Sequence, residues 1–133
     1  MTADGGAGQV LVVEDDPDLA ALLEIILSDA GYEVGVAGDG AQALAAVARR
    51  MPALILLDMR MPVMNGWEFA RAFDERFGHA APIVVVTAAE DAALRASEIG
   101  AEGWLEKPFD LDDVLATVAR FVARGRPDVQ PAQ

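Results

Sequence analysis

The sequence contains no cysteine and no long uninterrupted run of apolar residues. Without cysteine the chain has no disulfide framework and no thiolate metal site, which fits a reducing compartment. A helix that spans a bilayer needs roughly 18 consecutive apolar residues, and a secretory signal needs an apolar core near the N-terminus; neither pattern is present. We therefore expect a soluble, cytoplasmic protein without a membrane segment.

Positive charge is also scarce. Ten basic residues stand against 22 acidic ones, the formal net charge is −12, and Lys107 is the only lysine. Nucleic acids and anionic membrane surfaces carry the same sign of charge, so we expect no direct contact with either. The acidic residues can still bind a hard cation.

The hydrophobic content predicts one folded domain. The chain has 133 residues, of which 53% are hydrophobic, and this matches a single packed core. The first eight residues are small and polar, and residues 124–133 have no periodic pattern. We expect flexible tails at 1–8 and 124–133 around a domain at 9–123.

Short apolar runs alternate with helical patterns along this domain. Three nearly unbroken runs are typical of strands covered on both faces, at 10–13, 54–57 and 83–86, and two weaker strands lie at 33–37 and 103–105. Helical patterns occupy residues 19–27, 40–50, 69–77, 91–99 and 111–122. Five strands alternating with five helices predict an open α/β sheet.

Several polar residues are explained by helix starts. Asp16 precedes Pro17, which is typical of an N-cap followed by proline at the first helical position, and Asp18 in the first turn complements the helix dipole. Asn65 and Glu68 have the spacing of a capping box. We assign these residues to local structure rather than to chemistry.

Three carboxylates at strand ends lack such an explanation. Glu14 and Asp15 follow the first strand, and Asp58 follows the third. Ligands of open α/β sheets bind beyond the carboxyl ends of the strands, so the three carboxylates converge there if these strands are neighbours. A cation would relieve their repulsion, and oxygen ligands without histidine or cysteine favour Mg²⁺.

Two complementary groups stand at the ends of the fourth and fifth strands. Thr87 ends the fourth strand, and Lys107 follows the fifth and precedes Pro108. A compact ammonium group pairs well with a carboxylate or a phosphoryl oxygen. Each residue taken singly also fits a structural role, as a β-branched strand end or a solvated lysine, but together with the acids they indicate a site.

Four segments resemble the signature blocks of the response regulator receiver domain of two-component signalling. They are VLVVEDDPDL (10–19), LILLDMRMPVMNGWEF (54–69), IVVVTA (83–88) and GAEGWLEKPF (100–109), and the likeness covers residues 9–123. The resemblance implies a flavodoxin-like open parallel sheet of five strands in the order 2-1-3-4-5, with five helices on both faces.

The resemblance also implies the roles of the acidic residues. Asp58 would accept a phosphoryl group from a sensor histidine kinase or a phosphotransfer protein. Mg²⁺ would be bound by Glu14, Asp15, Asp58 and the backbone carbonyl of Arg60. In such phosphoryl transfer, the protein supplies an in-line nucleophile and positive charge around the equatorial oxygens.

The remaining roles implied by the resemblance concern the fourth and fifth strands. Thr87 would hydrogen-bond a phosphoryl oxygen, Lys107 would pair with it, and the peptide bond between Lys107 and Pro108 would be cis. Trp104 stands where the family has a tyrosine or phenylalanine that swings inward on activation. An indole is larger and needs a partner for its N–H when buried, so Trp104 is either a switch residue or a static packing residue.

Three functions are compatible with these residues. The one we expect is a stand-alone receiver, similar to chemotaxis regulators, that signals to a protein partner through the face formed by its fourth helix, fifth strand and fifth helix. The second is a receiver-like module that binds partners without phosphorylation. The third is a haloacid-dehalogenase-like phosphatase, but those enzymes carry a second acid two residues after the nucleophile, where this chain has Arg60.

Overall fold

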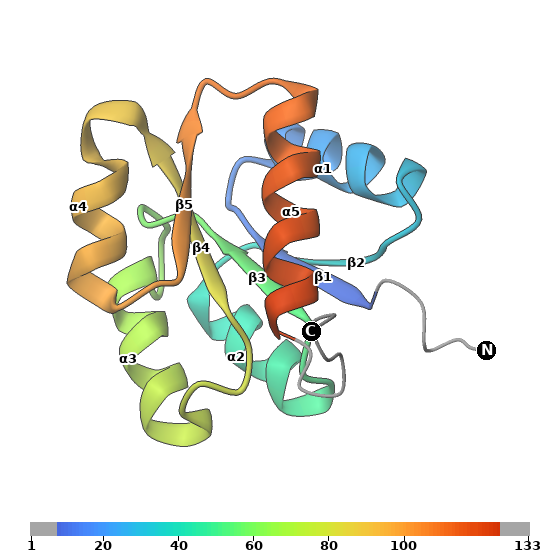
Figure 1. Ribbon diagram of the computed structural model, residues 1–133. Helices are drawn as coiled ribbons and strands as arrows, with labels where there is room; N and C mark the ends of the chain where they lie inside the picture. The colour runs from blue at the N-terminus through green and yellow to red at the C-terminus, as the bar shows by residue number, and fades with distance from the viewer. Residues whose placement is uncertain (1–7, 126–133) are drawn as a thin grey trace, which may run out of the picture.

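The apolar runs of the sequence form one parallel sheet in the computed structural model, which describes residues 8–125 (Figure 1). The strand order is β2-β1-β3-β4-β5, as the family resemblance predicted. The strands are β1 (Gln9–Val13), β2 (Glu33–Ala37), β3 (Leu54–Leu57), β4 (Ile83–Ala88) and β5 (Gly103–Lys107). Because β5 runs two residues further than expected, Lys107 is its last residue rather than the first residue of the next loop.

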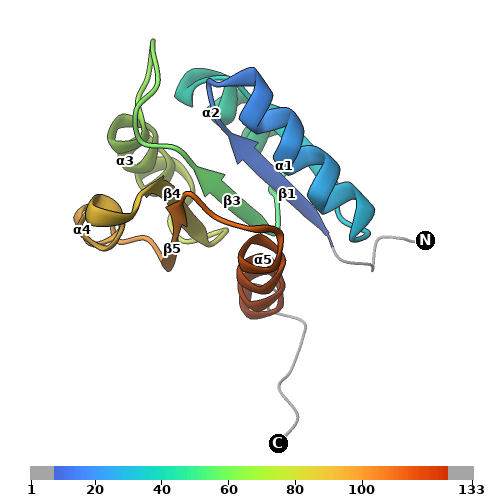
Figure 2. The same cartoon turned by 90° about the horizontal axis from the view of Figure 1, so that it is seen from above.

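Five helices cover the sheet on both faces. They are α1 (Pro17–Asp29), α2 (Gly40–Arg49), α3 (Gly66–Phe77), α4 (Ala89–Ile99) and α5 (Leu111–Gly125). Helices α1 and α5 lie on one face, and α2, α3 and α4 lie on the other (Figure 2). Helix α5 includes residues 124 and 125, which we had placed in the tail; the rest of the two predicted tails, apart from Gly8, lies outside the described residues.

The inner strands are almost entirely apolar because both of their faces are covered. In β1, Leu11 and Val13 pack into the core under α2 and α3, whereas Val10 and Val12 pack into the core under α1 and α5. All four side chains are at most 3% exposed. Burying such a side chain contributes about 1.5–3 kcal/mol, so the centre of the sheet is the most strongly held part of the domain.

The predicted helix starts are confirmed. The Asp16 carboxylate accepts hydrogen bonds from the backbone N–H groups of Asp18 and Leu19, and so caps α1 directly after β1. Asn65 and Glu68 form the reciprocal capping box of α3, with both hydrogen bonds at 2.9 Å. These caps fix where the chain leaves the sheet next to the acidic residues.

Among residues 8–125, no helix has the length and apolar character that a bilayer crossing requires.

Candidate functional site

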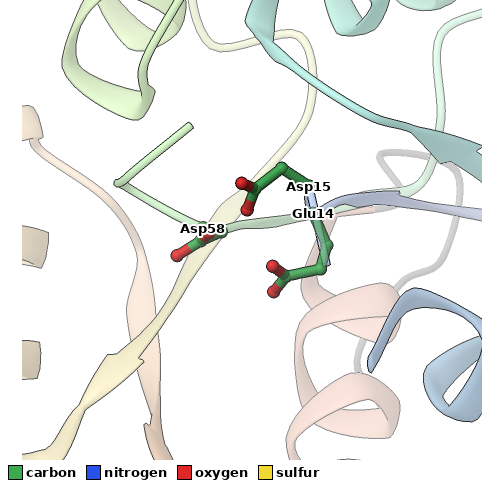
Figure 3. A group of neighbouring side chains, drawn as sticks. All are labelled: Glu14, Asp15 and Asp58. Carbon is green, nitrogen blue, oxygen red and sulfur yellow. The ribbon is translucent and has the colours of Figure 1, made fainter. Parts of the chain in front are cut away.

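The pairing of β1 with β3 brings the three unexplained carboxylates together. Val13 pairs with Leu57, and the backbone N–H of Asp58 donates to the carbonyl of Val13 at 3.0 Å, so both strands end at the same level. Glu14, Asp15 and Asp58 each offer a carboxylate oxygen, and these oxygens lie within 4.8 Å of one another. Figure 3 shows the three side chains around a common space at this edge of the sheet.

Two of these carboxylates are buried. Glu14 is 4% exposed and Asp58 is 8% exposed, whereas Asp15 is open to solvent. Burial, and next the charge of Asp58, raise the pKa of Glu14 to about 7. Burial likewise raises the pKa of Asp58, against the opposing effect of Lys107. The two buried carboxylates are therefore poorly solvated when both are ionised.

Lys107 supplies positive charge from β5. Its Nζ atom lies 3.4 Å from Oε1 of Glu14 and 3.8 Å from Oδ1 of Asp58. The peptide bond between Lys107 and Pro108 is cis. The ammonium group thus contacts both buried carboxylates, and Glu14 is the nearer of the two.

Thr87 and Arg60 lie at the same edge of the sheet as Asp58. Thr87 is 9% exposed near the carboxyl end of β4, the strand between those that lead to Asp58 and Lys107. The backbone N–H of Arg60 hydrogen-bonds the Asp58 carboxylate, which favours its ionised form. The role of the Arg60 carbonyl as a metal ligand stays a prediction.

Trp104 lies outside this cluster. Its neighbours Gly103 and Leu105 face α5, because Gly103 closely approaches the ring of Phe121 and Leu105 belongs to the core under α5. Successive side chains of a strand point to opposite faces, so Trp104 points to the other side of β5, where it is 44% exposed. In this state the indole faces outward, and its role as a switch stays a prediction.

Two positioning features were not foreseen from the sequence. The backbone N–H of Asp16 donates to Oε2 of Glu14 at 3.2 Å, so the residue that caps α1 also orients a site carboxylate. Gly66 lies against the end of β3: a Cβ there would come within 2.6 Å of the Met59 sulfur and 2.9 Å of the Asp58 carbonyl oxygen. The local sequence signals only a turn and a cap at these positions, and neither pattern reveals a contact with the site.

The donor set fits a hard divalent cation. Oxygen ligands about 2.1 Å from one Mg²⁺ lie at most about 4.2 Å apart, so carboxylate oxygens within 4.8 Å of one another reach that geometry through small side-chain rotations. A cation here also relieves the unfavourable burial of two like charges. Glu14, Asp15 and Asp58 are therefore the residues that could hold a metal.

Comparison with known proteins decides the family. The family model described as the response regulator receiver domain matches residues 10–119. The chain belongs to this family. This receiver is thus a two-component signalling domain with the flavodoxin-like fold, and the match favours it over the phosphatase alternative.

The receiver is similar to longer curated regulators. The DNA-binding response regulator MtrA of Mycolicibacterium smegmatis is 39% identical over 127 residues, which are 94% of this chain and 54% of that protein. The response regulator MprA of Mycobacterium leprae is 37% identical over 122 residues, 90% of this chain and 53% of that protein. The chain thus spans about half the length of these relatives, and its function as a stand-alone receiver stays a prediction.

Solved receivers have the same fold. A putative response regulator from Chloroflexus aurantiacus superposes with a TM-score of 0.81 at 30% identity, over 88% of this chain and 98% of that one. The chemotaxis response regulator CheY4 of Vibrio cholerae gives a TM-score of 0.77 at 35% identity, over 85% of this chain and 97% of that one.

Proposed function

We propose that this receiver accepts a phosphoryl group on Asp58 in a Mg²⁺-dependent reaction and thereby changes a protein-binding face. The observation that carries the proposal is the convergence of four charged groups: three carboxylate oxygens within 4.8 Å, and the Lys107 ammonium 3.8 Å from Asp58. Phosphoryl transfer requires a positioned nucleophile and positive charge around the transferred oxygens, and little else from the protein.

Asp58 acts as the nucleophile. One of its carboxylate oxygens attacks the phosphorus of a phosphohistidine, the new O–P bond forms as the P–N bond breaks, and the electron pair of that bond returns to the imidazole. The product is an acyl phosphate on Asp58. Mg²⁺ bound by Glu14, Asp15, Asp58 and the Arg60 carbonyl would neutralise the charge that builds up on the phosphoryl oxygens.

Lys107 and Thr87 bind the transferred group. The Lys107 ammonium, now shared between Glu14 and Asp58, pairs with a phosphoryl oxygen once Asp58 is phosphorylated. The Thr87 hydroxyl, buried near the end of the adjacent strand, donates to another phosphoryl oxygen. Movement of Thr87 toward the phosphoryl group begins the switch, and Trp104 on β5 is the candidate residue that responds.

The partners follow from this chemistry. A sensor histidine kinase or a phosphotransfer protein supplies the phosphoryl group in the cytoplasm, and the output protein binds the face formed by α4, β5 and α5. The net charge of −12 argues against direct contact between this chain and nucleic acid. The DNA binding named for MtrA belongs to a protein of which the chain matches about half.

Intact-mass measurement with acetyl phosphate and Mg²⁺ tests the proposal. The wild-type protein should gain one phosphoryl group, whereas Asp58→Asn and protein in EDTA should gain none. Asp74→Asn, which changes an exposed acid on α3, is the matched control and should be labelled like the wild type. Full labelling of Asp58→Asn would refute the assignment, and an unlabelled wild type would favour the phosphorylation-independent module.

A further inference from the structure

Helix α4 is weakly attached to the rest of the domain. Its buried face consists of the alanines Ala92 and Ala96, with Ile99 half-buried, so it contributes little apolar area to the core. Ala88 occupies its N-cap position without a side-chain hydrogen bond. The helix also begins only two residues after Thr87, so a displacement of Thr87 acts directly on an uncapped helix end.

Three polar and aromatic residues link α4 to α3, and we call them the α3–α4 clamp: Trp67, Arg95 and Glu98. The indole N–H of Trp67 donates to Oε1 of Glu98 at 2.9 Å. Arg95 pairs with the same carboxylate at 3.0 Å, and its guanidinium lies 5.3 Å from the centre of the Trp67 ring. Each clamp residue therefore contacts the other two.

The clamp spans a gap between the helices. Figures 1 and 2 show α3 and α4 side by side on the same face of the sheet. Beside the clamp lies a hollow of about 230 Å³ that is lined by residues of both helices: Trp67, Ala70, Arg71, Asp74, Glu98 and Ile99. Part of the α3–α4 boundary is therefore open space rather than packed side chains.

Trp67 connects the clamp to the site through the start of α3. It is the second residue of that helix, directly after Gly66, which packs against the backbone of Asp58 and Met59. Trp67 is partly buried and packs against the core under α2 and α3, and this packing holds its ring in place. The clamp thus ties the weakly attached helix α4 to the segment that carries the phospho-acceptor.

We propose that the α3–α4 clamp holds α4 in its unphosphorylated position, and that phosphorylation of Asp58 acts through Thr87 against this restraint. The inference rests on the proposed function. The clamp residues do not touch the reacting atoms and act as positioning residues that set the energetic cost of activation. A ligand that favours one of two states binds more tightly when the cost of reaching that state falls.

Beryllofluoride with Mg²⁺, a mimic of the phosphoryl group, provides the test on the whole chain. Trp67→Phe keeps an aromatic ring and removes the N–H donor, and Glu98→Gln keeps an acceptor and removes the charge. Each variant should bind beryllofluoride about three- to tenfold more tightly than the wild type in calorimetry, the range expected when one hydrogen bond is lost (Trp67→Phe) or one ion pair is weakened (Glu98→Gln). The amides of α4 should also exchange faster in the metal-free variants.

A double-mutant cycle makes the test specific. The coupling free energy between Trp67→Phe and Glu98→Gln, measured on unfolding, should be present in the free protein and smaller in the beryllofluoride complex. Glu75→Gln, an exposed change on α3 outside the clamp, is the control and should bind as the wild type does. Thermal melts of Trp67→Phe and Glu98→Gln establish that these variants are folded.

The outcomes separate this inference from the proposed function. A wild-type protein that binds no beryllofluoride would refute the proposed function itself. If the wild type binds, unchanged or weaker binding by both variants would overturn the clamp as a restraint on the unphosphorylated state, and so would a coupling that is equal in the two states.

Discussion

At the scale of single residues, Glu14 links the folding energy of the domain to its chemistry. A carboxylate that is 4% exposed and faces Asp58 is unfavourable when ionised, even with the Asp16 amide and Lys107 as partners. The same ionised form is the one that binds a cation. Metal binding would therefore convert an unfavourable charge of the folded state into a ligand.

This predicts how stability depends on pH without metal. The pKa of Glu14 is about 7 in the folded protein against 4.5 for a free glutamate, so the folded state holds the proton more tightly. Its stabilising contribution is complete below pH 4.5 and is lost as the pH rises to 7. The melting temperature in EDTA should fall across this range, and Glu14→Gln should flatten the fall; the exposed change Glu24→Gln should not.

Asp15 should matter more for the metal than for the metal-free fold, because it is the exposed member of the three. Mg²⁺ that binds only the folded state adds RT ln(1 + [L]/Kd), about 1.4 kcal/mol at roughly tenfold saturation. Asp15→Asn should abolish most of the rise in melting temperature that Mg²⁺ causes, while the melting temperature in EDTA stays equal or rises. An undiminished Mg²⁺ response would place the cation elsewhere.

At the scale of secondary structure elements, the junction of β3 and α3 determines how precisely Asp58 is held. Gly66 begins α3, and its backbone N–H donates to the Met59 carbonyl at 2.9 Å. An added methyl group would meet the backbone of Asp58 and Met59 as well as the Met59 sulfur, and the backbone cannot move aside as a flexible side chain can. The start of α3 can therefore approach the site only with glycine at this position.

Gly66→Ala should consequently displace the loop that follows Asp58. We expect the variant to be destabilised by about 1–3 kcal/mol, as for overpacked cores, and to be phosphorylated more slowly by acetyl phosphate. Urea unfolding and the rate of labelling by intact mass measure the two effects. Gly78→Ala tests the opposite case of a strained glycine without crowding, because its φ is +62° and nothing lies within 4 Å of its Cβ position; it should lower stability and leave the rate unchanged.

The elements were predictable because their signals are local. Unbroken apolar runs indicated β1, β3 and β4, and the spacing of Asn65 and Glu68 indicated the start of α3. The clamp was not predictable, since Trp67 and Glu98 are 31 positions apart and neither residue belongs to a local pattern. The outward direction of Trp104 also depends on which face of β5 packs against α5, and that is a property of the tertiary structure.

At the scale of the whole molecule, the net charge of −12 opposes compaction. Salt weakens this repulsion because the Debye length falls from about 10 Å at 0.1 M to about 3 Å at 1 M. We expect NaCl to raise the melting temperature gradually, and Mg²⁺ at matched ionic strength to raise it further. Equal effects of the two salts at equal ionic strength would mean that Mg²⁺ acts only by screening.

The site could be predicted as a set, but its internal contacts could not. Parallel strands end at one edge, so acids after β1 and β3 had to converge once those strands were neighbours, and the family resemblance supplied that order. The closer approach of Lys107 to Glu14 than to Asp58 depends on how one flexible side chain crosses the sheet. Strand ends in the sequence do not specify such a path.

The positions of the site residues along the sequence divide the protein into two complementary parts. The site side chains before the turn at Gly78 are the carboxylates that follow β1 and β3, and those after it are the hydroxyl of Thr87 and the ammonium of Lys107. The two parts meet at the pairing of β3 with β4, from Ile55 with Ile83 to Leu57 with Val85, and also where α5 packs against α1 and β3 and at the α3–α4 clamp. Two fragments cut in that turn would each carry half of the chemistry, so labelling of Asp58 would report their reassembly.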